Sequence, residues 1–188
     1  LLAGCAPLVI GGAMVGTALT VTDRRTAGTQ LEDEAIELKS LTRVREAVGE
    51  RGHVSSTSYN RTVLITGEVA SEADRAAVEQ AVARIENVRA TVNELAVAGA
   101  SSLASRSNDA ILTSKVKAGL IDAKDLQANT IKVVTERGVV YLMGRVTERE
   151  ADRATALARG VGGVAKVVRV FELISEAELA ELQPPQKK

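Results

Sequence analysis

The chain has 188 residues, 45% hydrophobic and 26% charged, which is typical of a globular protein and not of a disordered or polytopic membrane chain. Aromatic residues make up only 2%, and one cysteine and one histidine exclude an internal disulfide and a zinc cage, so composition disfavours stacking platforms and enzymes. The formal net charge of zero divides into −4 over residues 31–97 (12 acidic, 8 basic) and +4 over residues 106–174 (8 acidic, 12 basic), so the second half is better suited to an anionic surface.

The N-terminal residues indicate an attachment to a membrane. Leu1 to Cys5 read Leu-Leu-Ala-Gly-Cys and resemble a lipobox, the cleavage site at which a bacterial lipoprotein precursor exposes its lipidated cysteine. By resemblance to enterobacterial sorting, Ala6 favours the outer membrane. A buried, unreactive cysteine is one alternative, and a spanning helix over the uncharged residues 1–22 is another, although glycines, threonines and Pro7 make that stretch only weakly apolar. We therefore expect lipobox, lipidated cysteine and tether within residues 1–32.

The middle of the chain contains an internal repeat. Val63–Val69, with Gly67 near its end and Ala-Asp-Arg shortly after, is matched by Val140–Val146 with Gly144 and a second Ala-Asp-Arg. In both copies a hydroxyl residue and a carboxylate three positions later form a capping box that begins a helix. A stripe of apolar residues predicts another helix before each pair of strands, and the expected members are Ile36, Leu41, Val44 and Val48 in the first copy and Leu112, Val116 and Leu120 in the second.

Each copy is therefore predicted to run helix, strand, strand, helix, strand. The hairpin makes one strand pair antiparallel and the crossover helix makes the other parallel, so the fold is α+β with two tandem αββαβ units, each a three-stranded mixed sheet with two helices. We expect the first unit over residues 33–97, a linker over 98–107, the second unit over 108–174, and a short helix with a loose tail over 175–188. Because units of this size have a small core, we expect them to dock on each other.

The repeated unit resembles the BON domain family. The resemblance is carried by the apolar strand into Gly67-x-Val69 or Gly144-x-Val146, by the later Val88 or Gly163-Val164, and by the lipobox before two such units. It implies a protein that is not an enzyme, needs no cofactor, and binds anionic phospholipid mainly through the first helix of the second unit, in support of envelope integrity. One similar member of the family has tryptophan where this chain has Ile111.

The residues of that helix fit the implied role. We predict it from about Asp109, as its N-cap, to Ile121, with one stripe on the sheet and another facing outward. On the outer stripe, isoleucines would enter the acyl boundary while lysines meet phosphates. The same pattern is typical of an ordinary surface helix. The expected phospholipid-binding residues are Ile111, Ser114, Lys115, Val116, Lys117, Ala118 and Ile121.

The sequence gives less support to a catalytic histidine, to nucleic-acid binding and to a metal site. His53 follows a predicted helix and is expected to cap it or lie in a loop, because no nucleophile or orienting carboxylate stands beside it. The arginines after Gly144 alternate with carboxylates, as on a solvated, salt-bridged face, so we expect no nucleic acid as ligand. With one cysteine and one histidine, we also expect no metal. The alternative to lipid binding is an adaptor that docks on an envelope protein, for which an exposed apolar patch away from Ile111 would be the discriminating feature.

Overall fold

The computed structural model describes residues 23–182. Cys5, Pro7 and the last residues of the expected tail lie outside this range. The described chain forms five helices and seven strands together with two short 3-10 turns, Gly49–Arg51 and Ala128–Thr130. In chain order they are α2 (Ala27–Val48), β1 (Gly52–Tyr59), β2 (Thr62–Val69), α3 (Glu72–Ala83), β3 (Ala90–Asn93), β4 (Ala96–Val97), α4 (Leu103–Asp122), β5 (Ile131–Glu136), β6 (Val139–Val146), α5 (Glu148–Arg159), β7 (Lys166–Leu173) and α6 (Glu176–Leu182).

Two mixed sheets confirm the predicted α+β architecture of two repeated units. In the first unit (α2 to β4), β2 lies between antiparallel β1 and the parallel strands β3 and β4. In the second unit (α4 to β7), β6 lies between antiparallel β5 and parallel β7. The last strand is continuous in the second unit but is interrupted between β3 and β4 in the first.

The glycine shared by the two central strands allows a close approach between neighbouring strands. A Cβ atom added at Gly67 would lie 2.0 Å from the carbonyl oxygen of His53, and one at Gly144 would lie 2.4 Å from that of Thr130. Gly67 also has a φ of +114°, a backbone conformation that residues with a Cβ atom rarely adopt. This geometry explains why glycine occurs at the same place in both copies.

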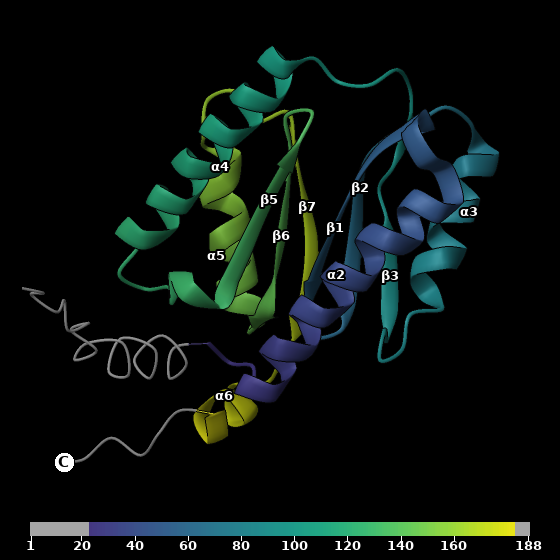
Figure 1. The fold of residues 1–188 in the computed structure, drawn as a ribbon. Helices are drawn as coiled ribbons and strands as arrows, with labels where there is room; N and C mark the ends of the chain where they lie inside the picture. Colours follow the sequence, from purple (N-terminus) through teal and green to yellow (C-terminus); the bar gives the residue numbers. More distant parts are fainter. Residues whose placement is uncertain (1–22, 183–188) are drawn as a thin grey trace, which may run out of the picture.

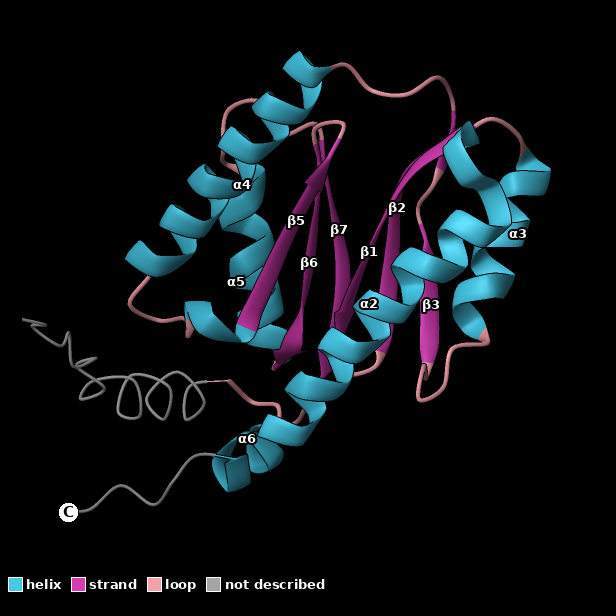
Figure 2. Cartoon of the chain, viewed as in Figure 1, coloured by secondary structure: helices cyan, strands magenta, loops and turns pink. Residues whose placement is uncertain are grey.

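The molecule is built in four layers, with helices outside and the two sheets facing each other (Figures 1 and 2). Each pair of helices covers an apolar core on the outer face of its own sheet. A third core between the sheets contains Tyr59 and Leu64 of the first unit and Tyr141 and Met143 of the second. Polar contacts also join the units, since the Tyr59 hydroxyl donates to the Thr130 carbonyl at 3.2 Å. The expected docking of the units is confirmed.

Both long helices begin earlier than the sequence predicted. The Thr26 side chain caps α2 and the Ser102 side chain caps α4, in each case by accepting the backbone N–H three residues later. Residues 27–32 are therefore helical and not tether, and α4 takes up the second half of the expected linker. Asp109 lies inside α4 instead of capping it.

The apolar stripe of the first helix was also wrong at one position. Ser40 is buried, whereas Leu41 is 60% exposed. Val44 is partly buried against the core of the first unit, and the fully buried residues of α2 are Asp33, Ile36, Ser40 and Val48. Two of these residues are polar, so apolar spacing alone selected the neighbouring leucine.

Candidate functional site

The outer face of α4 carries the predicted site. Leu112, Val116 and Leu120 turn inward and are buried in the second unit. Ile111 and Ile121 lie on the other side of the helix, 53% and 69% exposed. The remaining predicted residues are also exposed, and they are Ser114, Lys115, Lys117 and Ala118.

One predicted residue does not belong to this surface. Val116 is 1% exposed and packs in the core with Leu120 and Val140. Its side chain cannot reach a ligand outside the helix while α4 remains on the sheet, so the inclusion of Val116 was wrong. The stripe that binds the sheet and the stripe that faces outward are separate, as the helical period requires.

The exposed face combines apolar side chains with free positive charge. Positions 111, 114, 118 and 121 follow one another at three or four residues and so lie along one side of the helix. Within residues 23–182, neither Lys115 nor Lys117 has a hydrogen bond or an ion pair. The Ser114 hydroxyl donates to the Ala110 carbonyl at 3.0 Å, so the helix itself already satisfies it. The arrangement suits an interface that is apolar at its centre and anionic at its rim.

A cavity of about 370 Å³ opens beside the C-terminal half of this face. Its walls come from α4, from the loop and strand that follow, from the segment before α2 and from the end of β1. The lining residues are Arg25, Tyr59, Lys117, Leu120, Ile121, Ala128, Asn129, Ile131 and Lys132. Lys117 and Ile121 therefore belong to the exposed face and to the cavity at once.

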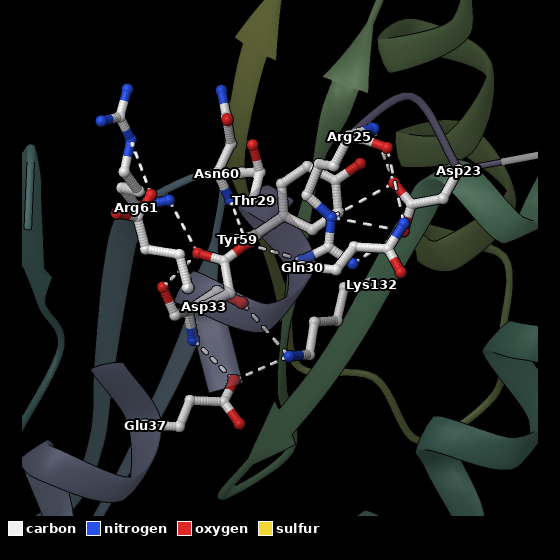
Figure 3. A network of polar contacts seen from close by, with 12 residues as sticks. Asp23, Arg25, Thr29, Gln30, Asp33, Glu37, Tyr59, Asn60, Arg61 and Lys132 are labelled. Atoms are coloured by element: carbon white, nitrogen blue, oxygen red, sulfur yellow. Dashed lines mark hydrogen bonds and ion pairs between the residues drawn. The ribbon is translucent and has the colours of Figure 1, made fainter. Parts of the chain in front are cut away.

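Three of the lining residues, Arg25, Tyr59 and Lys132, belong to a network of polar contacts (Figure 3). The Arg25 guanidinium lies 2.7 Å from a carboxylate oxygen of Asp23 and of Asp33, and 4.1 Å from the centre of the Tyr59 ring. Burial opposes the charge of Arg25, but the hydrogen bonds to Asp23 and Asp33 outweigh it and raise the pKa of this guanidinium. Burial, reinforced by the charge of Asp23, raises the pKa of Tyr59 to about 12. Both groups keep one protonation state throughout the physiological range.

Lys132 brings the second unit into the same network. Its ammonium lies 2.8 Å from Glu37 Oε1 and donates to the Ser58 carbonyl at 3.2 Å. Glu37 in turn accepts the backbone N–H of Ser58 at 2.8 Å. Lys132 of β5 thereby contacts both α2 and β1, and its charge is compensated from the first unit.

The segment before α2 is attached to the second unit by a buried ion pair. Arg24 donates from Nη1 and Nη2 to the two carboxylate oxygens of Glu150, at 2.8 and 2.7 Å, and both side chains are 5% exposed. Nη1 also donates to the Arg145 carbonyl at 2.7 Å. Burial opposes ionisation of Glu150, but Arg24 and the Thr147 N–H hold its pKa below the usual range. Arg24 therefore attaches the segment before α2 to a defined point on the second unit.

Sequence reasoning missed a carboxylate that repeats with the fold. Asp33 of α2 accepts the backbone N–H groups of Asn60 and Arg61, the turn between β1 and β2. Asp109 of α4 accepts those of Arg137 and Gly138, the corresponding turn of the second unit. The spacing of 76 residues is common to the two aspartates and, within a residue, to the rest of the repeat, so alignment of the two copies could have revealed the pair.

His53 and Glu68 form a second polar group, on neighbouring strands. His53 lies in β1, not at a helix end, which corrects the expectation of a cap or loop. Its Nδ1 is 3.8 Å from Glu68 Oε2, and Arg137 of the second unit approaches Glu68 Oε1 to 3.6 Å. Neither distance is a hydrogen bond. Among residues 23–182, no three His, Cys, Asp or Glu side chains gather closely enough to hold a metal ion.

The first unit exposes an apolar surface of its own. Leu31, Leu38 and Leu41 of α2 are all more than half exposed. They follow at seven and three residues, so they share one side of the helix.

None of the helices in the described part of the chain is long and apolar enough to cross a membrane.

Comparison with known proteins places this fold in a family. The BON domain family matches residues 33–99 and 108–174, which correspond closely to the two structural units, and the chain belongs to this family. It is a protein with two BON domains. It is also a DolP-like protein, because it is 36% identical over 175 residues to the outer membrane lipoprotein DolP of Haemophilus influenzae, with 92% of this chain and 90% of the relative covered.

Two further relatives are more distant. The 21 kDa hemolysin of Actinobacillus pleuropneumoniae is 29% identical over 154 residues, covering 81% of this chain and 79% of the relative. The osmotically-inducible protein Y of Escherichia coli is 29% identical over 148 residues, covering 74% and 72%. All three alignments are longer than one BON domain.

Proposed function

We propose that this protein is a lipid-anchored outer-membrane protein, facing the periplasm, that binds anionic phospholipid of the inner leaflet through α4 and supports envelope integrity. The observation that carries the proposal is the outer face of α4, where Ile111 and Ile121 are exposed next to Lys115 and Lys117, neither of them paired within the described chain. The outer-membrane location is supported by the relationship to the lipoprotein DolP of Haemophilus influenzae.

The anchor and the helix act together in this proposal. Cys5 is the proposed lipidation site, and 17 residues separate it from Asp23, the first described residue. A chain of that length reaches at most about 60 Å. Because Arg24 fixes the chain to the second unit, the anchor keeps that unit close to the membrane, where weak headgroup affinity is effective through high local concentration.

Vesicle flotation of the full chain with Cys5→Ser tests the proposal without the anchor. We expect salt-sensitive flotation with phosphatidylglycerol vesicles and none with phosphatidylcholine vesicles. Ile111→Asp removes an apolar contact worth about 1.5–3 kcal/mol, so binding should fall at least about tenfold. Circular dichroism should be unchanged because Ile111 is exposed.

Leu38→Asp is the matched control, since it places the same charge on an equally exposed apolar site of α2. Equal losses for the two variants, or retained binding by Ile111→Asp, would remove α4 as the binding element. Absence of flotation by the parent chain would leave Cys5 as the proposed attachment and favour the second candidate.

The second candidate is an adaptor that docks on an envelope protein. The exposed leucines of α2 favour it, because they form an apolar stripe away from Ile111. In this case Leu38→Asp should abolish capture of an envelope protein by the full chain, while Ile111→Asp leaves it intact. The reverse pattern would exclude α2 as the docking surface.

A further inference from the structure

The cavity at the end of α4 has an unusual balance of charge. Three cationic side chains line it, and none of the lining residues is a carboxylate. Arg25 is neutralised by Asp23 and Asp33, and Lys132 by Glu37, all from behind the wall. Lys117 alone among the three has no such partner within residues 23–182. The Lys117 ammonium is therefore the cation of this lining that is available to pair with a ligand.

Apart from Asn129, the remaining walls are mostly apolar. Leu120, Ile121, Ala128 and Ile131 line the cavity together with the Tyr59 ring. A volume of about 370 Å³ lies at the small end of the range for ligand sites and suits a small polar group attached to the start of an alkyl chain. Such a ligand would place its charge near Lys117 and its carbon atoms against the isoleucines.

We propose that this cavity receives the phosphodiester headgroup of a phospholipid, and this inference rests on the function proposed above. A phosphodiester carries one negative charge, which matches the single uncompensated lysine. Ile121 borders the cavity and also belongs to the exposed stripe with Ile111, so acyl chains leaving the cavity run along that stripe. Arg25 and Tyr59 contribute from the first unit's side, so headgroup recognition requires both units docked.

The proposal predicts different contributions to binding from Lys115 and Lys117, whereas attraction to a charged surface alone predicts similar ones. Lys115 and Lys117 are both exposed on α4 and both unpaired in the described chain, but only Lys117 lines the cavity. If the headgroup enters the cavity, Lys117 makes a direct, charge-assisted contact and Lys115 contributes only long-range attraction. The two alanine variants lose the same net charge and are matched controls for each other.

The test compares Lys117→Ala with Lys115→Ala in the full chain carrying Cys5→Ser, by titration with phosphatidylglycerol vesicles. We expect Lys117→Ala to weaken binding about tenfold or more and Lys115→Ala about twofold. Equal losses overturn the cavity proposal and leave lipid binding by α4 intact. Failure of the parent chain to bind vesicles overturns both proposals.

A second measurement compares binding of a phospholipid and of inorganic phosphate in the cavity. Dihexanoyl phosphatidylglycerol below its micelle concentration should give saturable amide NMR shifts at Ala128, Ile131 and Lys132, and Lys117→Ala should abolish them. Inorganic phosphate should produce less than about a tenth of this affinity, because it lacks the apolar part of the ligand. Equal binding of inorganic phosphate, or saturable shifts elsewhere only, contradicts the proposal.

Discussion

Arg24→Ala is the substitution that most directly tests how the N-terminal segment is attached. The change removes two hydrogen bonds to Glu150 and one to the Arg145 carbonyl, all between 2.7 and 2.8 Å. It leaves a buried carboxylate without its counter-ion, which typically costs about 3–5 kcal/mol. Glu150 retains the Thr147 N–H at 2.9 Å, so we expect the lower end, about 3 kcal/mol.

Urea unfolding followed by circular dichroism measures this cost. With an m-value of about 1–3 kcal/mol per molar urea, the midpoint at pH 7 should fall by about 1–3 M. Arg24→Met with Glu150→Gln is the control, because it removes both charges and keeps an oxygen that can accept the Thr147 N–H. This pair should recover much of the loss.

The pH dependence gives an independent check. The folded pKa of Glu150 is held below its unfolded value, so the ion pair stabilises the fold above the unfolded pKa and this contribution disappears as pH falls through the folded pKa. The difference between parent and Arg24→Ala should therefore shrink on acidification. A loss below about 1 kcal/mol at pH 7, or a constant difference across pH, would show that Arg24 is not buried against Glu150 in solution.

Three further substitutions have expected outcomes on stability. Gly67→Ala should cost at least about 2 kcal/mol in a urea titration, since its Cβ would collide with the His53 carbonyl; an unchanged midpoint would contradict the close strand approach. Asp109→Ala should cost about 3 kcal/mol by removing two hydrogen bonds to the turn after β5, and faster amide exchange should appear at that turn. Burial, with the charges of Glu68 and Asp109, raises the pKa of Glu136, so Glu136→Gln should raise the thermal midpoint at pH 7, and this gain should vanish at acidic pH where the parent carboxyl is protonated.

Local pattern predicted the elements of the fold well. The alternation of apolar residues, the shared glycine and the hydroxyl–carboxylate caps predicted two αββαβ units, and Thr147 with Glu150 forms the expected capping box. Ser71 caps α3 in the same way, but Asp74 turns its carboxylate to the Ser71 hydroxyl and to Arg51. Helix starts were predicted less well, because Thr26 and Ser102 precede stretches without strong apolar periodicity.

Part of the candidate site could also be predicted from the sequence, and part could not. The outward position of Ile111, Lys115, Lys117 and Ile121 follows from the helical period. The same period places Val116 on the inward stripe with Leu112 and Leu120, so its inclusion in the site conflicted with the helical pattern. The cavity could not be predicted, since it needs Arg25 and Lys132 to lie on either side of the junction between the units. No periodic signal connects residues so far apart.

Taken by itself, the amino-acid sequence determined the repeat, the order of strands and helices in each unit, the charge difference between the units and the face that α4 presents outward. The repeat and the charge difference are read directly from the order of residues, and the elements and the outward face follow from the helical and strand periods. The tertiary structure alone decided that the two sheets face each other across Leu64 and Tyr141, and that Arg24 reaches Glu150 across 126 positions. Such contacts depend on how two finished surfaces fit and on which buried charges find partners, and neither is encoded in any local stretch of chain.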